Sequence, residues 1–352
     1  MRRIYLIRHG HPDFPLGAHM CLGRTDTALG PLGRMQACLL GEVLRGRGLE
    51  IFSSPLTRCR ETAAPLGDEA VIVPELAEQD MGPWDGLDFG EIRERWPELY
   101  ERRAKEPLLV PPGAESLEAV ARRVIPALSD CVERSKGDIA IVAHASVIQA
   151  ILARLRGIPL EDSRPLRIPY ASYAVLRYAG EFEADSSASR PCLPLTATIA
   201  EKLLKAAAPG ERVEAHCRAV AAEALRIADA LPIELNRELI GSAALLHDTA
   251  RKEKDHARLG AAWLRELGYA AAAGIVERHH DLCGEEIDEA AVVYIADKCV
   301  REDRRVTLEE RFAASEGRCL NEEARIAHAA RRESALRLRD EINGISGKTV
   351  VE

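Results

Sequence analysis

The chain has 352 residues, 47% of them hydrophobic and 30% charged, and its 48 Lys and Arg against 56 Asp and Glu give a net charge of −8. This length favours about two domains, and the apolar content excludes an intrinsically disordered chain. No run of about 18 apolar residues could cross a bilayer, and the acidic balance disfavours nucleic acid and anionic membranes as partners. We therefore expect a globular protein that binds small molecules.

Up to about residue 180, short β-rich runs alternate with amphipathic helical stretches. The expected strands are Arg3–Arg8, Glu50–Ser53, Val71–Val73, Asp138–Ala143 and Ser172–Tyr178. The expected helices are Pro31–Arg47, Leu56–Ala64, Phe89–Lys105, Ser116–Ser135 and Ser146–Leu155. Such alternation predicts an α/β domain, with a largely parallel sheet and helices on both of its faces.

A Ser- and Pro-rich stretch without periodicity, ADSSASRPCLP, begins at Ala184 and predicts a linker over 184–195. The residues after it are mostly strong helix formers. The helices expected there are Thr196–Ala208, Arg212–Ala230, Ile233–His247, His256–Leu267, Ala270–His280, Ala290–Arg301 and Asn321–Glu341. The sequence thus predicts an α/β domain over 1–183 and an all-α domain over 196–352.

The nine cysteines are odd in number, widely spread and free of any CxxC pair. This pattern predicts reduced thiols and a cytoplasmic protein rather than a disulfide framework. The opening MRRIYLIRHG becomes polar after four apolar residues, so we expect neither a signal peptide nor a membrane anchor.

Polar residues follow three of the expected strands. Arg8 ends the strand Arg3–Arg8 and His9 follows it. Ser54 follows the strand Glu50–Ser53, with Arg58 in the next helix along the chain. His144 follows the strand that ends at Ala143. Because ligands of open α/β sheets bind beyond the carboxyl ends of the strands, we expect the two imidazoles at one edge. The remaining histidines of this half, His11 and His19, are expected in loops, at most lining the entrance.

The segments IYLIRHG, GRTDTALGPLGRMQA, SSPLTRCRETA, ELAEQDMGPWDG and VAHASVI resemble, in this order, the histidine phosphatase superfamily with its phosphoglycerate-mutase-like fold. The resemblance covers about residues 1–180. It implies His9 as the nucleophile that takes a phosphoryl group, Arg8 and Arg58 as phosphate clamps, His144 as a further phosphate contact, Glu78 as the general acid, and no metal. The residue types suit this chemistry, since a neutral imidazole can attack phosphorus and guanidiniums neutralise the transferred group.

The interval between Glu78 and His144 leaves little room for the insertion that cofactor-dependent mutases of this family usually carry. The sequence therefore favours a phosphatase, similar to α-ribazole phosphatases or of broad specificity. A phosphoglycerate-type mutase is the alternative.

A second group of histidines and aspartates lies in the C-terminal half. Its members are His216, His247, Asp248, His256, His279, His280 and Asp297. Apolar residues at helical spacing predict that His216 and Asp297 point inward. A buried ionised aspartate needs a cation, and imidazole with carboxylate suits Fe, Mn, Co or Zn.

This order resembles the HD superfamily of metal-dependent phosphohydrolases over about residues 210–305. The resemblance implies one metal on His216, His247, Asp248 and Asp297, and a second on His256 with His279 or His280, bridged by Asp248. The segments LLHDTARKEKDHARLGA and VVYIADK are similar to the branch that includes symmetrical dinucleoside-tetraphosphate hydrolases.

Together these features predict a bifunctional phosphohydrolase that acts on a small phosphorylated metabolite or nucleotide. One or two divalent transition-metal ions are expected in the C-terminal domain. The alternative is a single active phosphatase whose HD domain is a nucleotide-binding regulatory module.

Overall fold

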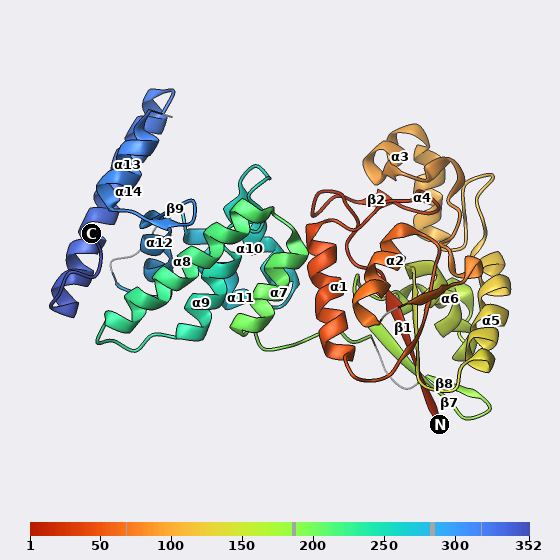
Figure 1. Ribbon diagram of the computed structural model, residues 1–352. Coiled ribbons are helices and arrows are strands. Elements are labelled where there is room, and N and C mark those ends of the chain that lie inside the picture. Colours follow the sequence, from red (N-terminus) through yellow and green to blue (C-terminus); the bar gives the residue numbers. More distant parts are fainter. Residues whose placement is uncertain (68, 185–187, 282–285, 318) are drawn as a thin grey trace. The chain divides into compact units, whose positions relative to one another are not determined.

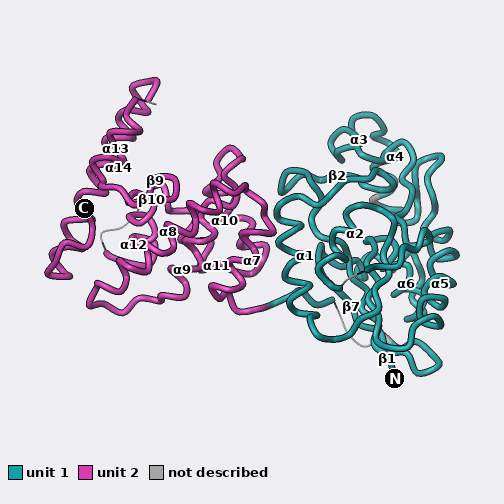
Figure 2. Tube along the Cα trace, in the orientation of Figure 1, with its two compact units in different colours: residues 1–192 teal, residues 193–352 magenta. Residues whose placement is uncertain are grey.

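The computed structural model describes residues 1–67, 69–184, 188–281, 286–317 and 319–352. It divides into two compact units, Met1–Cys192 and Leu193–Glu352 (Figure 2). Of the expected linker 184–195, residues 185–187 lie outside the described residues. None of the helices in the described ranges is both long and apolar enough to cross a membrane.

The first unit is built on a six-stranded sheet with the order β4-β3-β6-β1-β7-β8 (Figure 1). Its strands are β1 (Arg2–Arg8), β3 (Glu50–Ser53), β4 (Ala70–Ile72), β6 (Ile139–Ala143), β7 (Tyr173–Tyr178) and β8 (Phe182–Ala184). The four strands from β4 to β1 are parallel, whereas β7 and β8 add an antiparallel edge. The expected α/β class with a largely parallel sheet is confirmed.

The side chains of each strand point alternately to the two faces of the sheet. Because the strands are apolar on both faces, helices cover each face. The helices are α1 (Pro31–Leu44), α2 (Thr57–Ala63), α5 (Leu117–Arg134) and α6 (Ala145–Leu155). Ile4 and Leu6 of β1 belong to the core shared with α5 and α6. Tyr5 and Ile7 belong to the opposite core, shared with α1 and α2. Figure 1 shows these two helix pairs on opposite sides of β1.

The single helix expected over Phe89–Lys105 is two helices, α3 (Phe89–Arg95) and α4 (Pro97–Lys105). Trp96 between them has φ −137° and ψ 59°, outside the helical region. The cause is Pro97, since a proline disfavours helical backbone in the residue before it. Figure 1 shows α3 and α4 beyond the end of the sheet toward which β1 runs, near the short strand β2 (Met20–Cys21). Strand β2 pairs with the equally short β5 (Leu87–Asp88).

The second unit is almost entirely helical, as expected. Its helices are α7 (Ala197–Ala207), α8 (Glu211–Ala230), α9 (Arg237–Leu246), α10 (His256–Glu266), α11 (Ala270–Arg278), α12 (Glu289–Lys298), α13 (Leu308–Glu316) and α14 (Glu322–Ser346). One departure is the hairpin of β9 (Val300–Arg301) and β10 (Arg304–Arg305), where a helix to Arg301 was expected. Glu302 turns this hairpin with φ 60°.

The helix expected from Ile233 begins instead at Arg237. The Asn236 side chain accepts a hydrogen bond from Leu239 N at 3.0 Å, which is the usual N-cap interaction at a helix start. Helix α13 was not expected at all. Its start is set by a capping box in which the side chains of Thr307 and Glu310 bond to each other's backbone N–H.

Candidate functional site

In the first unit, the carboxyl ends of three adjacent parallel strands carry polar residues to one edge of the sheet. Arg8 of β1 is in register with Ala143 of β6, so His9 and His144 follow at the same level. Their ring centroids lie 5.1 Å apart. Ser54, which follows β3, places its hydroxyl 2.8 Å from His144 Nε2. The structure thus brings the two expected histidines side by side.

His9 is a buried imidazole with a defined tautomer. Its Nδ1 lies 2.8 Å from Gly10 O, and because a carbonyl can only accept, Nδ1 holds the proton and Nε2 keeps a lone pair. Burial lowers the pKa of His9 well below its usual value, and the guanidiniums of Arg58 and Arg8 lower it further. Burial, His9 and Arg58 likewise lower the pKa of His144. The site therefore offers a neutral nitrogen nucleophile in a cationic environment.

Two arginines supply the positive charge of this site. Arg58, which is fully buried, donates to Thr25 O at 2.7 Å and to Gly23 O at 2.8 Å. Arg8 donates to Ile168 O at 2.8 Å. The Nε atoms of both arginines are buried and have no hydrogen-bond partner in the part of the chain that the structure describes. Since unpaired buried donors on a cation are costly, these atoms fit a site that binds an anion such as phosphate.

Glu78 provides the carboxyl group of this edge. It is 6% exposed, its Oε1 accepts from Gln79 N at 2.8 Å, and its Oε2 lies 3.4 Å from Ser146 N. Ser146 is two residues beyond His144, in the first turn of α6. All five residues singled out in this half therefore lie around one site.

Tyr170 also lines this site, although the sequence did not predict it. The Arg8 guanidinium lies 3.8 Å from the centre of its ring, and the rings of His9 and His11 each lie 5.4 Å from it. Tyr170 lies just before the amino end of β7. Because β7 is antiparallel, that end lies at the same edge as the carboxyl ends of the parallel strands. His11, expected in a loop, is 7% exposed and lines the site as well.

The loop that holds His9 rests directly on α1. A Cβ atom at Gly10 would lie 2.6 Å from Gly33 O, and one at Gly33 would lie 2.0 Å from His11 O. No side chain fits at either position. The two glycines therefore allow the close backbone contact that sets the place of the imidazole.

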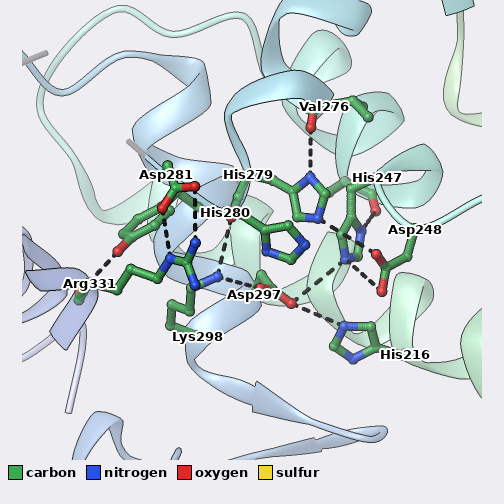
Figure 3. Close-up of polar contacts among 12 residues, drawn as sticks. His216, His247, Asp248, Val276, His279, His280, Asp281, Asp297, Lys298 and Arg331 are labelled. Atoms are coloured by element: carbon green, nitrogen blue, oxygen red, sulfur yellow. Dashed lines mark hydrogen bonds and ion pairs between the residues drawn. The ribbon is translucent and has the colours of Figure 1, made fainter. Parts of the chain in front are cut away.

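In the second unit, histidine and aspartate side chains from several helices converge on one point (Figure 3). His216 lies on α8, His247 and Asp248 follow α9, His256 begins α10, His279 and His280 follow α11, and Asp297 lies near the end of α12. They form three overlapping groups of possible metal ligands, each with its ligand atoms within 4.8 Å of one another. These are His216 with His247 and Asp297, His247 with Asp248 and His279, and His256 with His279 and His280.

Backbone carbonyls orient three of these imidazoles. The Nδ1 atoms of His216, His247 and His279 lie 2.8, 2.7 and 2.6 Å from carbonyl oxygens. The carbonyls belong to Glu302, Ala244 and Val276, respectively. Each Nδ1 is therefore a donor, which leaves Nε2 as the metal-binding atom. This arrangement is typical of histidines that ligate metals.

Buried atoms without partners test whether a cation fits here. Among the described residues, His247 Nε2, His279 Nε2 and Asp248 Oδ1 are buried and form no hydrogen bond of acceptable geometry. The carboxylate oxygen lies 3.6 Å from His279 Nε2, too far for a hydrogen bond but suitable for two ligands of one ion. Imidazole and carboxylate together suit a divalent transition metal. The residues present therefore fit a metal.

The buried carboxylate of Asp297 is shared between the imidazoles and a lysine. Its Oδ1 lies 3.1 Å from His216 Nε2 and 3.7 Å from His247 Nε2, and its Oδ2 accepts from Lys298 Nζ at 2.7 Å. Burial raises the pKa of Asp297, but the Lys298 ammonium and the two imidazoles outweigh it and hold the pKa well below its usual value. Lys298, which the sequence analysis missed, also donates to His279 O (Figure 3).

The third group lies on the other side of Asp248. His256 Nε2 is 3.2 Å from Asp248 Oδ1 and 2.8 Å from His280 Nε2. Burial lowers the pKa of His280 to about 2, and the nearby His279 and Lys298 lower it too, so that this imidazole is neutral. Asp248 therefore stands between two sets of nitrogen atoms, in the place a bridging carboxylate would take.

Comparison with known families matches both units. Residues 4–184 match the histidine phosphatase superfamily, branch 1, and residues 213–302 match the HD domain. The first match alone covers more than half of the chain.

Similar proteins match the first unit. The glucosyl-3-phosphoglycerate phosphatase of Mycolicibacterium vanbaalenii is 32% identical over 53% of this chain and 87% of its own length. Phosphoserine phosphatase 1 of Hydrogenobacter thermophilus is 31% identical over 50% of this chain and 86% of its own. A solved mycobacterial structure described as hydrolase 2 is 29% identical, with a TM-score of 0.51, over 59% of this chain and 97% of its own.

The metal centre generates a first prediction. We expect the full-length chain to bind Mn, Fe, Co or Zn, and Asp248→Asn to weaken that binding by about 10 to 100-fold or more, because the carboxylate serves two groups of ligands. Elemental analysis, and thermal unfolding with added metal, measure this. Asp303→Asn, an exposed aspartate on the hairpin, is the control. A wild-type chain that neither contains nor is stabilised by any of the four metals would contradict the prediction.

A second prediction concerns the charge of His9. Because its pKa and that of His144 are lowered, both imidazoles should remain neutral as the pH falls from 7 to about 5.5, where ordinary histidines with a pKa near 6.5 become charged. Nitrogen-15 NMR of the histidine-labelled chain reports this directly, with the His9 signal identified by its loss in His9→Gln. Protonation of that signal with a midpoint of about 6 or above would be inconsistent with the buried cationic site.

Proposed function

The chain belongs to the histidine phosphatase superfamily and carries an HD domain, and from this we propose that it is a bifunctional phosphohydrolase. One activity is a phosphomonoesterase that works through a phosphohistidine, and the other is a metal-dependent hydrolase of a nucleotide or dinucleotide phosphate. We further propose the domains 1–183 and 196–352, joined by the linker 184–195. A cytoplasmic location is also proposed, from the spacing of the cysteines.

The observation that carries the phosphatase proposal is the state of His9. Its Nδ1 proton is held by Gly10 O, so its Nε2 lone pair is available beside the unpaired Nε atoms of Arg8 and Arg58. In the proposed reaction, Nε2 attacks the phosphorus of the bound ester. The Nε2–P bond forms while the P–O bond to the alcohol breaks, and the two guanidiniums stabilise the charge on the transferred oxygens.

Glu78 is proposed to act first as the general acid and then as the general base. Its buried carboxyl group gives a proton to the leaving alcohol oxygen as the ester bond breaks. A water molecule then attacks the phosphohistidine, and the Glu78 carboxylate takes one of its protons. Phosphate leaves, neutral His9 is restored, and Glu78 is protonated again for the next turnover. His144, in contact with His9, is proposed to bind a phosphate oxygen.

We propose a small phosphomonoester as the substrate of this half, in the manner of α-ribazole phosphatases or with broad specificity. Two relatives are named as phosphatases, one of glucosyl-3-phosphoglycerate and one of phosphoserine, which favours hydrolysis over the alternative of a phosphoglycerate-type mutase.

In the HD domain, we propose that His216, His247, Asp248 and Asp297 hold one divalent metal. His256 with His279 or His280 would hold a second. When bound, such metals supply a hydroxide nucleophile and a clamp for phosphate oxygens. The protein contributes orientation, because the carbonyls behind the imidazoles set the direction of each Nε2, and Lys298 sets that of Asp297. Arg251 lies 3.5 Å from Asp248 Oδ1, within reach of a nucleotide phosphate.

The phosphatase proposal is tested with an aryl phosphate in the presence of EDTA. His9→Ala should reduce turnover by about 1,000-fold or more and abolish trapping of labelled phosphate on the protein, because His9 is the proposed covalent nucleophile. His328→Gln, in the second unit, should leave both unchanged. Full metal-free activity in His9→Ala would refute the role of His9.

The HD proposal is tested with diadenosine tetraphosphate and ATP in the presence of Mn, Fe, Co or Zn. Asp248→Asn should lose most of this hydrolysis and retain the metal-free aryl phosphatase activity, whereas His9→Ala should show the opposite pattern, since each residue belongs to a different unit. If nucleotides bind the wild-type chain and alter its aryl phosphatase activity without being hydrolysed, the HD domain is the regulatory module instead.

A further inference from the structure

A cavity of about 410 Å³ lies in the first unit, outside the group of residues assigned to phosphoryl transfer. Its walls include Arg103 and Tyr100 of α4, Phe89 at the start of α3 and His19 before β2, together with Arg164 and Arg167 at the two ends of a short 3-10 helix (Arg164–Leu166) that follows α6 in the chain. Three arginines on one cavity, which two aromatic rings also line, make a strongly cationic surface for an acidic protein.

These arginines lack acidic neighbours. In the ranges that the structure describes, no carboxylate oxygen lies within 4.0 Å of the guanidinium of Arg103, Arg164 or Arg167. Burial lowers the pKa of Arg103, and Arg167 and Arg164 lower it as well, which shows that like charges are crowded here. Crowded cations with no internal counter-charge favour an anionic ligand.

One of the arginines is held in place by a buried side chain. Gln149 of α6 is 5% exposed, and its Oε1 accepts from Arg167 Nε at 2.8 Å. Its Nε2 donates to Ser163 Oγ at 2.7 Å, which fixes the orientation of the amide. The contact with Gln149 therefore fixes the orientation of the Arg167 guanidinium, as expected for a preorganised binding site.

The same segment of chain connects this cavity to His9. Ile168 O, next to Arg167, accepts the hydrogen bond from Arg8, Tyr170 lies against Arg8 and His9, and Ala171 N donates to His9 O at 3.1 Å. Arg167 and Ala171 are four positions apart, which is at most about 14 Å of extended chain. One small metabolite is long enough to span these two positions.

Building on the phosphatase activity proposed for His9, we propose that this cavity, defined by Arg103, Arg164 and Arg167, binds a second anionic group of the substrate. The preferred substrates are then phosphomonoesters that also carry a carboxylate or a second phosphate. The arginines contact the end of the substrate that does not react, and so they determine specificity rather than the chemical step.

Matched substrates test the proposal on the full-length chain in EDTA. 3-Phosphoglycerate and glycerol 3-phosphate differ only in a carboxylate that replaces a hydroxymethyl group, so the ratio of their kcat/KM values measures the cavity's contribution. We expect the wild type to favour 3-phosphoglycerate by roughly 10-fold or more, and Arg164→Gln/Arg167→Gln to remove most of that preference. Arg102→Gln, also on α4 but paired with Glu106 at the surface, should leave the ratio unchanged.

Binding measurements separate this proposal from that for His9. Calorimetry on His9→Ala, which cannot turn over by the proposed route, compares 3-phosphoglycerate with glycerol 3-phosphate, and fructose 1,6-bisphosphate with fructose 6-phosphate. The proposal is supported if the first member of either pair binds more tightly and if this difference is lost when Arg164→Gln/Arg167→Gln is added to His9→Ala. The pair that shows the difference identifies the second anionic group as a carboxylate or a phosphate. This holds even if aryl phosphate is not hydrolysed, a result that would refute only the phosphatase proposal.

The proposal is overturned if neither pair shows a preference in the wild type. It is equally overturned if a preference persists unchanged in Arg164→Gln/Arg167→Gln while aryl phosphate is still hydrolysed through His9, since another part of the molecule then recognises the second anion.

Discussion

Burying an ionised or strongly polar group without a partner costs several kcal/mol, and each unit of this protein has such groups at its candidate site. In the first unit the uncompensated charge is positive, on Arg8 and Arg58. In the second unit it consists of imidazole nitrogens and carboxylate oxygens that face one another around Asp248. In our proposal, a phosphate group would complete the first arrangement and a metal ion the second. The helices and strands around each site hold these groups in position.

Much of this could be predicted from the sequence because the relevant rules are local. The uninterrupted apolar run of β1 indicates a strand buried on both faces, and the polar residues that follow it are expected at the sheet edge. His9 and His144 are therefore close in the structure for the reason that their positions after two parallel strands suggested. In the second unit, helical spacing likewise indicated which way His216 and Asp297 face.

What the sequence did not reveal depends on chain direction and on contacts between distant segments. Tyr170 reaches His9 only because β7 runs antiparallel, and no local pattern distinguishes that direction. Gln149 looks like an ordinary helix residue until Arg167, 18 positions later, folds onto it. The hairpin after α12 was hidden because its two-residue strands are shorter than any periodic pattern, yet its Glu302 carbonyl orients His216.

The use of main-chain carbonyls behind His216, His247 and His279 has an evolutionary consequence. A carbonyl oxygen is supplied by every amino acid, so Glu302, Ala244 and Val276 can be exchanged for other residues without altering the tautomer of the imidazole in front of them. Selection on these supports therefore acts on backbone shape, through the ends of helices and the turn of the hairpin, rather than on side-chain identity. Related chains can change the side chain at such a position while their ligand geometry stays the same, provided that the new side chain fits the core around Ala244 and Val276 and that insertions and prolines are kept out.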